Sequence, residues 1–305
     1  MRLISYSRSG KFSNFGDDLN LWLWPKLLPD ILDNDSNFLF VGIGTLINNN
    51  NVIPNAEKIA IFSTGVGYGK GTPKPDASWK IYCLRGPLSA KALGLPEELA
   101  ITDGALLIRK LKECFTRQVK YKFSYMPHFE FAERNSLSWE SVCRKIGFQF
   151  IDPRWEVDKV LEALSETEVL LTEAMHGAIV ADALRIPWIP ICTHTTILPF
   201  KWKDWCTSVG LEYRPNYVLP LKSYSVSPGF STSVNFAVKC ARQNKTRTLS
   251  LLTKDREDIL SSQFLNVSKL AYPQLSKDTT LNLLLEKLEE KLDEFKSDYK
   301  NEVFS

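Results

Sequence analysis

The chain has 305 residues, of which 44% are hydrophobic and 24% are charged. These proportions are typical of a soluble globular protein of one or two domains, and they exclude a largely disordered chain, a collagen-like chain and a small disulfide-stabilised protein. The formal net charge of +3 gives no basic surface of the kind that nucleic-acid binding requires. The six cysteines show no CxxC or CxxH spacing, so we expect free thiols and no metal site.

No targeting or membrane-spanning segment is expected. The apolar stretch at the N-terminus is too short for a secretory signal, and polar residues follow it at once. No run reaches the roughly 18–20 apolar residues of a membrane span. The sequence therefore predicts a cytoplasmic protein. Peripheral association with the inner face of the membrane and the oligomeric state are left open.

The first third of the chain alternates short apolar runs with glycine-rich turns. We expect strands at residues 3–7, 38–43, 58–63 and 81–84. A helix rich in Leu and Trp is expected after Phe15, with the Asp17-Asp18 pair in its first turn. Strands that end in glycine and lead into helices are typical of a parallel α/β sheet, whose loops gather at its carboxyl edge.

A second set of alternating elements follows the charged stretch 109–122. We expect strands at residues 123–126, 149–151, 168–172 and 188–192. We expect helices between them, at residues 138–146, 157–164 and 178–184. The two sets predict an α/β protein with two Rossmann-like domains facing a cleft, at residues 1–115 and 116–220. A helical C-terminal extension, residues 221–305, is expected to pack on the body.

That extension contains two predicted helices. One spans residues 231–243, and the other is an amphipathic helix near the C-terminus. The apolar residues of this second helix recur at helical spacing, at Leu281, Leu285, Leu288, Leu292 and Phe295. Packing of this face on a partner chain is the alternative.

Three histidines occur, His128, His176 and His194, and each lies at or just after a predicted strand end. This edge of an open α/β sheet is where ligands bind. At His176-Gly177 the start of the following helix offers backbone N–H groups and a dipole that attract phosphate or carboxylate. Gly177 permits a close approach of the backbone to a ligand. The alternative is a tight turn with a structural histidine.

Arg85 is placed similarly, between a predicted strand and the Gly86-Pro87 start of a helix. Its guanidinium is suited to bidentate binding of a phosphate or carboxylate, through two parallel N–H···O hydrogen bonds. An exposed arginine or an ion pair between domains is the alternative. The glycine-rich run 65–69 does not fit the GxGxxG dinucleotide motif, because its third glycine comes one residue early.

Seven short motifs occur in order, at residues 14–20, 42–46, 84–89, 102–107, 126–128, 173–185 and 200–205. Together they resemble the polysaccharide pyruvyl transferases, in the succinoglycan-type bacterial branch, over about residues 1–210. The block around Met175-His176-Gly177-Ala178 is the most specific. Residues after 220 carry no motif of the family.

The resemblance implies a GT-B-like fold. It also implies transfer of a pyruvyl group from phosphoenolpyruvate to two hydroxyls of a hexose, which forms a cyclic ketal. The acceptor would be a surface polysaccharide or its precursor, with a lipid-linked precursor left open. Phosphoenolpyruvate is the co-substrate, and neither a metal nor another cofactor is expected. The first domain would face the acceptor, and the second the donor.

We assign the binding of the donor substrate to Arg85, His176 and Gly177. His176 would bind the donor phosphate or serve as the acid. His128 is the candidate for acid–base work facing the sugar. Candidates for acceptor binding are Asp17, Lys201, Trp202 and Asp204. The alternative for the last three is a packed amphipathic helix. Some family members carry an arginine where this chain has Ala174, so either Arg85 or another basic residue must compensate, or the donor is bound differently.

Two other functions fit the sequence less well. A GT-B glycosyltransferase would share the fold, but it would need an acidic ligand for the ribose of a nucleotide sugar, and no clear candidate is present late in the second domain. A non-catalytic glycan-binding scaffold would bind sugars but no phosphoenolpyruvate. The strand-end placement of all three histidines argues against it.

Overall fold

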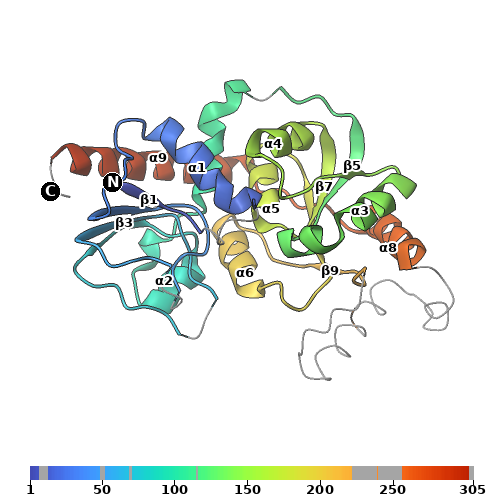
Figure 1. The fold of residues 1–305 in the computed structure, drawn as a ribbon, viewed down its shortest axis with the longest axis horizontal. Helices are drawn as coiled ribbons and strands as arrows, with labels where there is room; N and C mark the ends of the chain where they lie inside the picture. Colours follow the sequence, from blue (N-terminus) through green and yellow to red (C-terminus); the bar gives the residue numbers. More distant parts are fainter. Residues whose placement is uncertain are drawn as a thin grey trace. The chain divides into compact units, whose positions relative to one another are not determined.

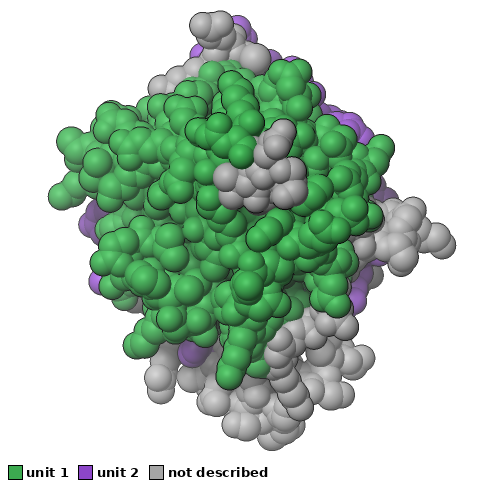
Figure 2. All heavy atoms as spheres, turned by 90° about the vertical axis from the view of Figure 1, so that its left-hand side faces the viewer, with its two compact units in different colours: residues 1–114, 198–213, 276–305 green, residues 115–197, 214–275 purple. Residues whose placement is uncertain are grey.

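A computed structural model describes residues 1–6, 13–48, 52–68, 71–114, 116–221, 239 and 256–301. The chain divides into two compact units, which Figure 2 colours separately. Unit 1 comprises Met1–Cys114, Leu198–Tyr213 and Ser276–Ser305, and unit 2 comprises Phe115–Ile197 and Arg214–Leu275. Each unit is built on its own parallel sheet.

The compact units divide the chain differently from the three predicted ranges. The first change of unit, between Cys114 and Phe115, lies next to the boundary expected near residue 115. Residues 198–213, however, belong to unit 1, and the C-terminal range is shared between the units. Periodicity shows which face of a helix is apolar, but it does not show which sheet that face covers.

The sheet of unit 1, in which Figure 1 labels β1 and β3, has four parallel strands in the order β1-β2-β3-β4. They are β1 (Arg2–Ile4), β2 (Phe38–Val41), β3 (Lys58–Phe62) and β4 (Trp79–Cys83). The helical elements of unit 1 are α1 (Phe15–Leu27), α2 (Pro87–Leu93), η1 (Glu97–Leu99), η2 (Gly104–Cys114), α6 (Pro199–Ser208) and α9 (Asp278–Lys300). Strands were thus expected in the right places, with ends shifted by a few residues.

Helices cover both faces of this sheet. On one face, Trp24 of α1 packs edge-on against Phe40 and Phe62, and Phe295 of α9 packs against Phe40 and Tyr82. On the other face, α2 and Phe200 of α6 join the apolar side chains of the strands. The buried residues of α9 are Leu281, Leu284, Leu288, Leu292 and Phe295, so Leu284 replaces the expected Leu285.

The sheet of unit 2 has five parallel strands in the order β6-β5-β7-β8-β9. They are β5 (Tyr121–Met126), β6 (Gln149–Phe150), β7 (Thr167–Thr172), β8 (Trp188–Cys192) and β9 (Asn216–Tyr217). Counted within the unit this is the doubly wound order 2-1-3-4-5, in which the winding direction reverses between β5 and β7. Such a reversal is where open α/β sheets bind ligands, at the carboxyl ends of the strands.

The helices of unit 2 are α3 (Phe129–Lys145), α4 (Val157–Ser165), α5 (Met175–Ala183) and α8 (Arg256–Leu270). On one face of the sheet, Tyr125 packs against Trp139 of α3 and Phe264 of α8. Helix α3 begins at Phe129 instead of Ser138, and α8 was not expected. The helix predicted at residues 231–243 lies, apart from residue 239, outside the described residues.

None of the helices in the described part of the chain is both long and apolar enough to cross a membrane. Within the same residues, no group of three or more His, Cys, Asp or Glu side chains is placed to hold a metal ion.

Candidate active site

The three histidines lie at one edge of the unit 2 sheet, around the reversal of winding. His128 follows β5 and is the N-cap of α3, and His176 is the second residue of α5, which follows β7. His194 follows β8. Met126 is paired with Thr172, and Thr172 with Pro190, so the carboxyl ends of these three strands are neighbours. The expected placement of the histidines at strand ends is thus what the structure has.

Phe131, in the first turn of α3, brings two of the histidines together. Its ring centroid lies 5.6 Å from that of His128 and 5.2 Å from that of His194. Burial lowers the pKa of His194, and the positive charge of Arg134 lowers it further. The Nδ1 atom of His194 accepts the backbone N–H of Thr196 at 3.3 Å, which requires that nitrogen to be unprotonated. The accepting Nδ1 atom and the lowered pKa both favour the neutral imidazole of His194.

Glu173 is a fully buried carboxylate between these histidines along the sheet edge. Its Oε1 accepts the backbone N–H of Thr193 at 2.6 Å, and its Oε2 accepts the hydroxyl of Tyr125 at 2.9 Å. Oε2 also accepts the backbone N–H of His128 at 3.4 Å. Burial raises the pKa of Glu173, and these hydrogen bonds oppose the rise.

Glu173 was not among the residues predicted for the site. One signal could have found it: an acidic residue directly follows the apolar run Val169-Leu170-Leu171-Thr172 and precedes an apolar helix. Such a carboxylate must be buried or lie at a site, and both cases demand donors from other segments. The sequence does not show which segments supply those donors.

Gly177 has a packing role that the sequence did not indicate. The residue is buried in the first turn of α5, and a methyl group on its Cα would lie 2.6 Å from Sδ of Met126 and 3.0 Å from Oγ1 of Thr172. Glycine therefore lets α5 lie close to the ends of β5 and β7. This contact accounts for Gly177 without a ligand, and its predicted part in donor binding stays a prediction.

We expect Gly177→Ala to lower the free energy of unfolding by about 1–3 kcal/mol, the usual cost of an added methyl group in a packed interior. Urea unfolding followed by circular dichroism measures the loss. In a Met126→Ala background, which removes the sulfur atom, the same change should cost clearly less. An equal cost in both backgrounds would show that contact with Met126 is not the reason for the glycine.

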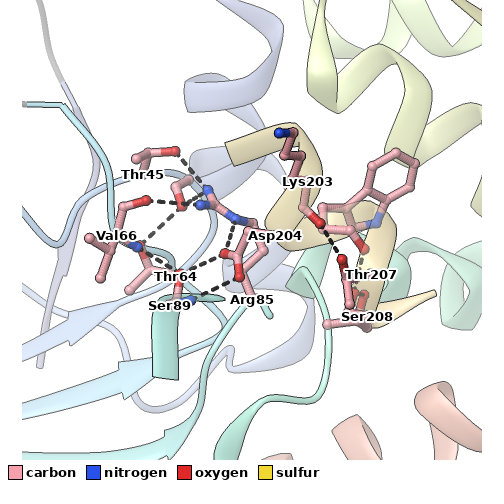
Figure 3. Close-up of polar contacts among 12 residues, drawn as sticks. Thr45, Thr64, Val66, Arg85, Ser89, Lys203, Asp204, Thr207 and Ser208 are labelled. Atoms are coloured by element: carbon pink, nitrogen blue, oxygen red, sulfur yellow. Dashed lines mark hydrogen bonds and ion pairs between the residues drawn. The ribbon is translucent and has the colours of Figure 1, made fainter. Parts of the chain in front are cut away.

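Arg85 lies in the interior of unit 1 and is fully buried. Figure 3 shows the polar contacts of its side chain. Its Nε donates to Asp204 at 3.0 Å, and its Nη2 donates to the carbonyl of Val66 at 3.1 Å. Its Nη1 donates to the carbonyl of Gly44 at 3.2 Å and to Oγ1 of Thr45 at 2.7 Å. These contacts support a framework role, and the N–H groups that they use are not available to a donor substrate.

Asp204 joins α6 to α2 of the same unit. It accepts the backbone N–H of Ser89 at 2.9 Å and the Ser89 hydroxyl at 2.5 Å, in addition to Arg85 (Figure 3). A methyl group on Gly86 would lie 2.2 Å from the Asp204 carbonyl, and one on Gly65 would lie 2.3 Å from the Arg85 guanidinium. The glycines make room for the ion pair, which is internal to unit 1.

The other predicted acceptor residues also lie in unit 1. Trp202 is fully buried and stacks on Tyr213 with ring centroids 5.0 Å apart, so α6 matches the alternative of a packed amphipathic helix. Lys201 is nearly buried, and its Nζ donates to the hydroxyl of Tyr68 at 2.9 Å. Asp17, in the first turn of α1, accepts the side chain of Asn14 at 2.7 Å. Their predicted contacts with a sugar stay predictions.

The fold defines an α/β protein with two parallel sheets, as expected, whereas the GT-B-like arrangement stays a prediction. No family model matches the chain. The chain is 39% identical over 214 residues to the succinoglycan biosynthesis protein ExoV of Rhizobium meliloti (strain 1021). The matched residues make up 70% of this chain and 67% of that protein. The chain therefore belongs to the succinoglycan-type polysaccharide pyruvyl transferases, which confirms the resemblance of its motifs.

Proposed function

We propose that the protein transfers a pyruvyl group from phosphoenolpyruvate to two hydroxyls of a hexose, forming a cyclic ketal on a succinoglycan-type polysaccharide or its precursor. Membership of the family supports the class of reaction. The observation that carries the proposal for the site is the gathering of His128 and His194 around Phe131, at the reversal of winding beside the start of α5.

The proposed reaction needs groups that move protons. C3 of phosphoenolpyruvate takes up a proton and becomes a methyl group, while C2 forms two bonds to sugar oxygens. The bond from C2 to the phosphate oxygen breaks. Of the two protons that the sugar hydroxyls lose, one balances the proton gained by C3 and the other leaves with phosphate. Histidine suits this work because its ordinary pKa of about 6.5 lies near neutrality.

We assign these tasks to the edge of unit 2. The first turn of α5, with His176, would bind the donor phosphate, because N–H groups at a helix start and the helix dipole attract anions. His128 would serve as acid or base toward the sugar. Burial lowers the pKa of His194, which favours the neutral form that accepts a proton. Because Arg85 is engaged within unit 1, we do not rely on it for the phosphate.

Thermal melting with phosphoenolpyruvate tests the donor. At about 100 times its dissociation constant, a ligand stabilises the folded state by about 2.7 kcal/mol. We expect an upward shift with phosphoenolpyruvate that exceeds the shifts with phosphate and pyruvate and that shrinks in His176→Ala. A shift with UDP-glucose alone would favour glycosyl transfer. No shift with phosphoenolpyruvate, with or without a succinoglycan-type acceptor, would contradict the proposal.

A further inference from the structure

Glu173 is a buried carboxylate for which the proposed reaction has no direct use, and it lies where three strands of unit 2 end. We propose that Glu173 is a positioning residue, which fixes His128 and His194 at the sheet edge by holding the loops that carry them. The inference rests on the proposed function for the claim that these histidines react. Its structural part stands on the contacts of Glu173 alone.

The two carboxylate oxygens bind two different loops. Oε1 holds the backbone N–H of Thr193, the residue directly before His194. Oε2 holds the backbone N–H of His128 and the hydroxyl of Tyr125 on β5. One rigid group therefore connects the segment after β5 with the segment after β8, across the end of β7.

The backbone that carries Glu173 is itself fixed. Its N–H donates to the carbonyl of Met126 at 2.9 Å. The next residue, Ala174, donates its N–H to Oγ1 of Thr172 at 3.0 Å. These two hydrogen bonds fix the backbone at Glu173, independently of the contacts that its carboxylate makes with the two loops. Misplacing a reacting group by about 1 Å is enough to cost about a hundredfold in rate, so such an anchor has a direct consequence for turnover.

A glutamine of the same size cannot replace these contacts. Its amide offers one acceptor oxygen and one NH₂ donor, so one of the two loops faces a donor where it needs an acceptor. The Thr193 contact is the shortest, at 2.6 Å, and should keep the oxygen. The Tyr125 hydroxyl can turn and accept, but the backbone N–H of His128 cannot. Glu173→Gln should therefore release His128 first.

Nuclear magnetic resonance of the histidine rings tests this directly, because the chain has only three histidines. Single His→Ala variants assign the three imidazole signals. In Glu173→Gln we expect the His128 signal to move most at a fixed pH of 7 and the His194 signal to move less. The melting temperature should change by no more than about 5 °C, since the change conserves the size of the side chain.

Asp182→Asn is the matched control. Asp182 is also buried in unit 2, but it lies at the far end of α5, where it accepts the indole N–H of Trp188 at 3.0 Å at the start of β8. We expect this variant to leave the signals of His128 and His194 in place. If Glu173→Gln leaves them in place as well, or if both variants move them equally, the positioning role is wrong.

Turnover separates this proposal from the proposed function. With phosphoenolpyruvate and an acceptor, Glu173→Gln should lower kcat about tenfold to a hundredfold with little change in KM. Glu173→Asp, which keeps both carboxyl oxygens on a shorter side chain, should recover part of that loss. If the wild-type protein shows no pyruvyl transfer while the histidine signals still move in Glu173→Gln, the proposed function fails and the positioning of the histidines stands. If Glu173→Gln turns over at the wild-type rate, the positioning role in the reaction is wrong.

Discussion

Arg85→Ala should lower the free energy of unfolding by about 3–5 kcal/mol, a large share of the total stability of an ordinary protein. The change leaves the carboxylate of Asp204 buried without its cation. It also removes the donors that the carbonyls of Gly44 and Val66 accept, at 3.2 and 3.1 Å. Urea unfolding followed by circular dichroism measures the loss.

Lys110→Ala is the control for this prediction. Lys110 pairs with Glu289 at 2.7 Å in the same unit. Unlike Arg85 and Asp204, these two side chains are partly exposed, at 40% and 34%. Water screens such a pair, so its loss should cost less than about 1 kcal/mol. A similarly small cost for Arg85→Ala would contradict the framework role of the buried pair.

The double variant Arg85→Ala/Asp204→Ala refines the result. Because each single change leaves a buried charge without a partner, the two losses should add to clearly more than the loss in the double variant. Strict additivity would mean that the two side chains act independently, in spite of their 3.0 Å contact.

The sheets of both units could be predicted because their strands are short apolar runs that end in glycine or polar residues. The predicted strand 188–192 coincides with β8, and the other predicted strands differ at their ends by a few residues. The short strand β9 was not predicted. The order of the strands could not be predicted, because the apolar pattern of β7 does not show that its neighbour is β5 rather than β6. The reversal of winding, which locates the candidate site, depends on that order.

The site could be predicted only in its local part. A histidine after a strand is visible in the sequence, and the three histidines lie where such a pattern places them. The partners of Arg85 and Glu173 were not visible, because each contact joins segments far apart: Arg85 and Asp204 are 119 residues apart. A buried charge signals that partners exist, but only the packing of the sheet edges determines which partners they are.

His128→Ala should lower the rate of pyruvyl transfer by about 10²–10⁴-fold, the usual contribution of a group that moves a proton. His176→Ala should also lower the rate, because it weakens the binding of phosphoenolpyruvate. Both side chains are only half-buried, so the melting temperature should change little. A coupled assay of phosphate release from phosphoenolpyruvate, in the presence of a saccharide acceptor, measures the rate. Tyr121→Ala, which removes an exposed ring at the opposite end of β5, is the control and should keep full activity.

The two variants should differ in how they fail, because we assign the histidines different tasks. His176→Ala should raise KM for phosphoenolpyruvate and reduce the melting shift that this ligand produces, since His176 lies at the start of α5 beside the proposed phosphate site. His128→Ala should lower kcat and leave that melting shift intact, since its task is proton transfer. The opposite pattern would exchange the two assignments. Near-normal activity in either variant would remove that histidine from the mechanism.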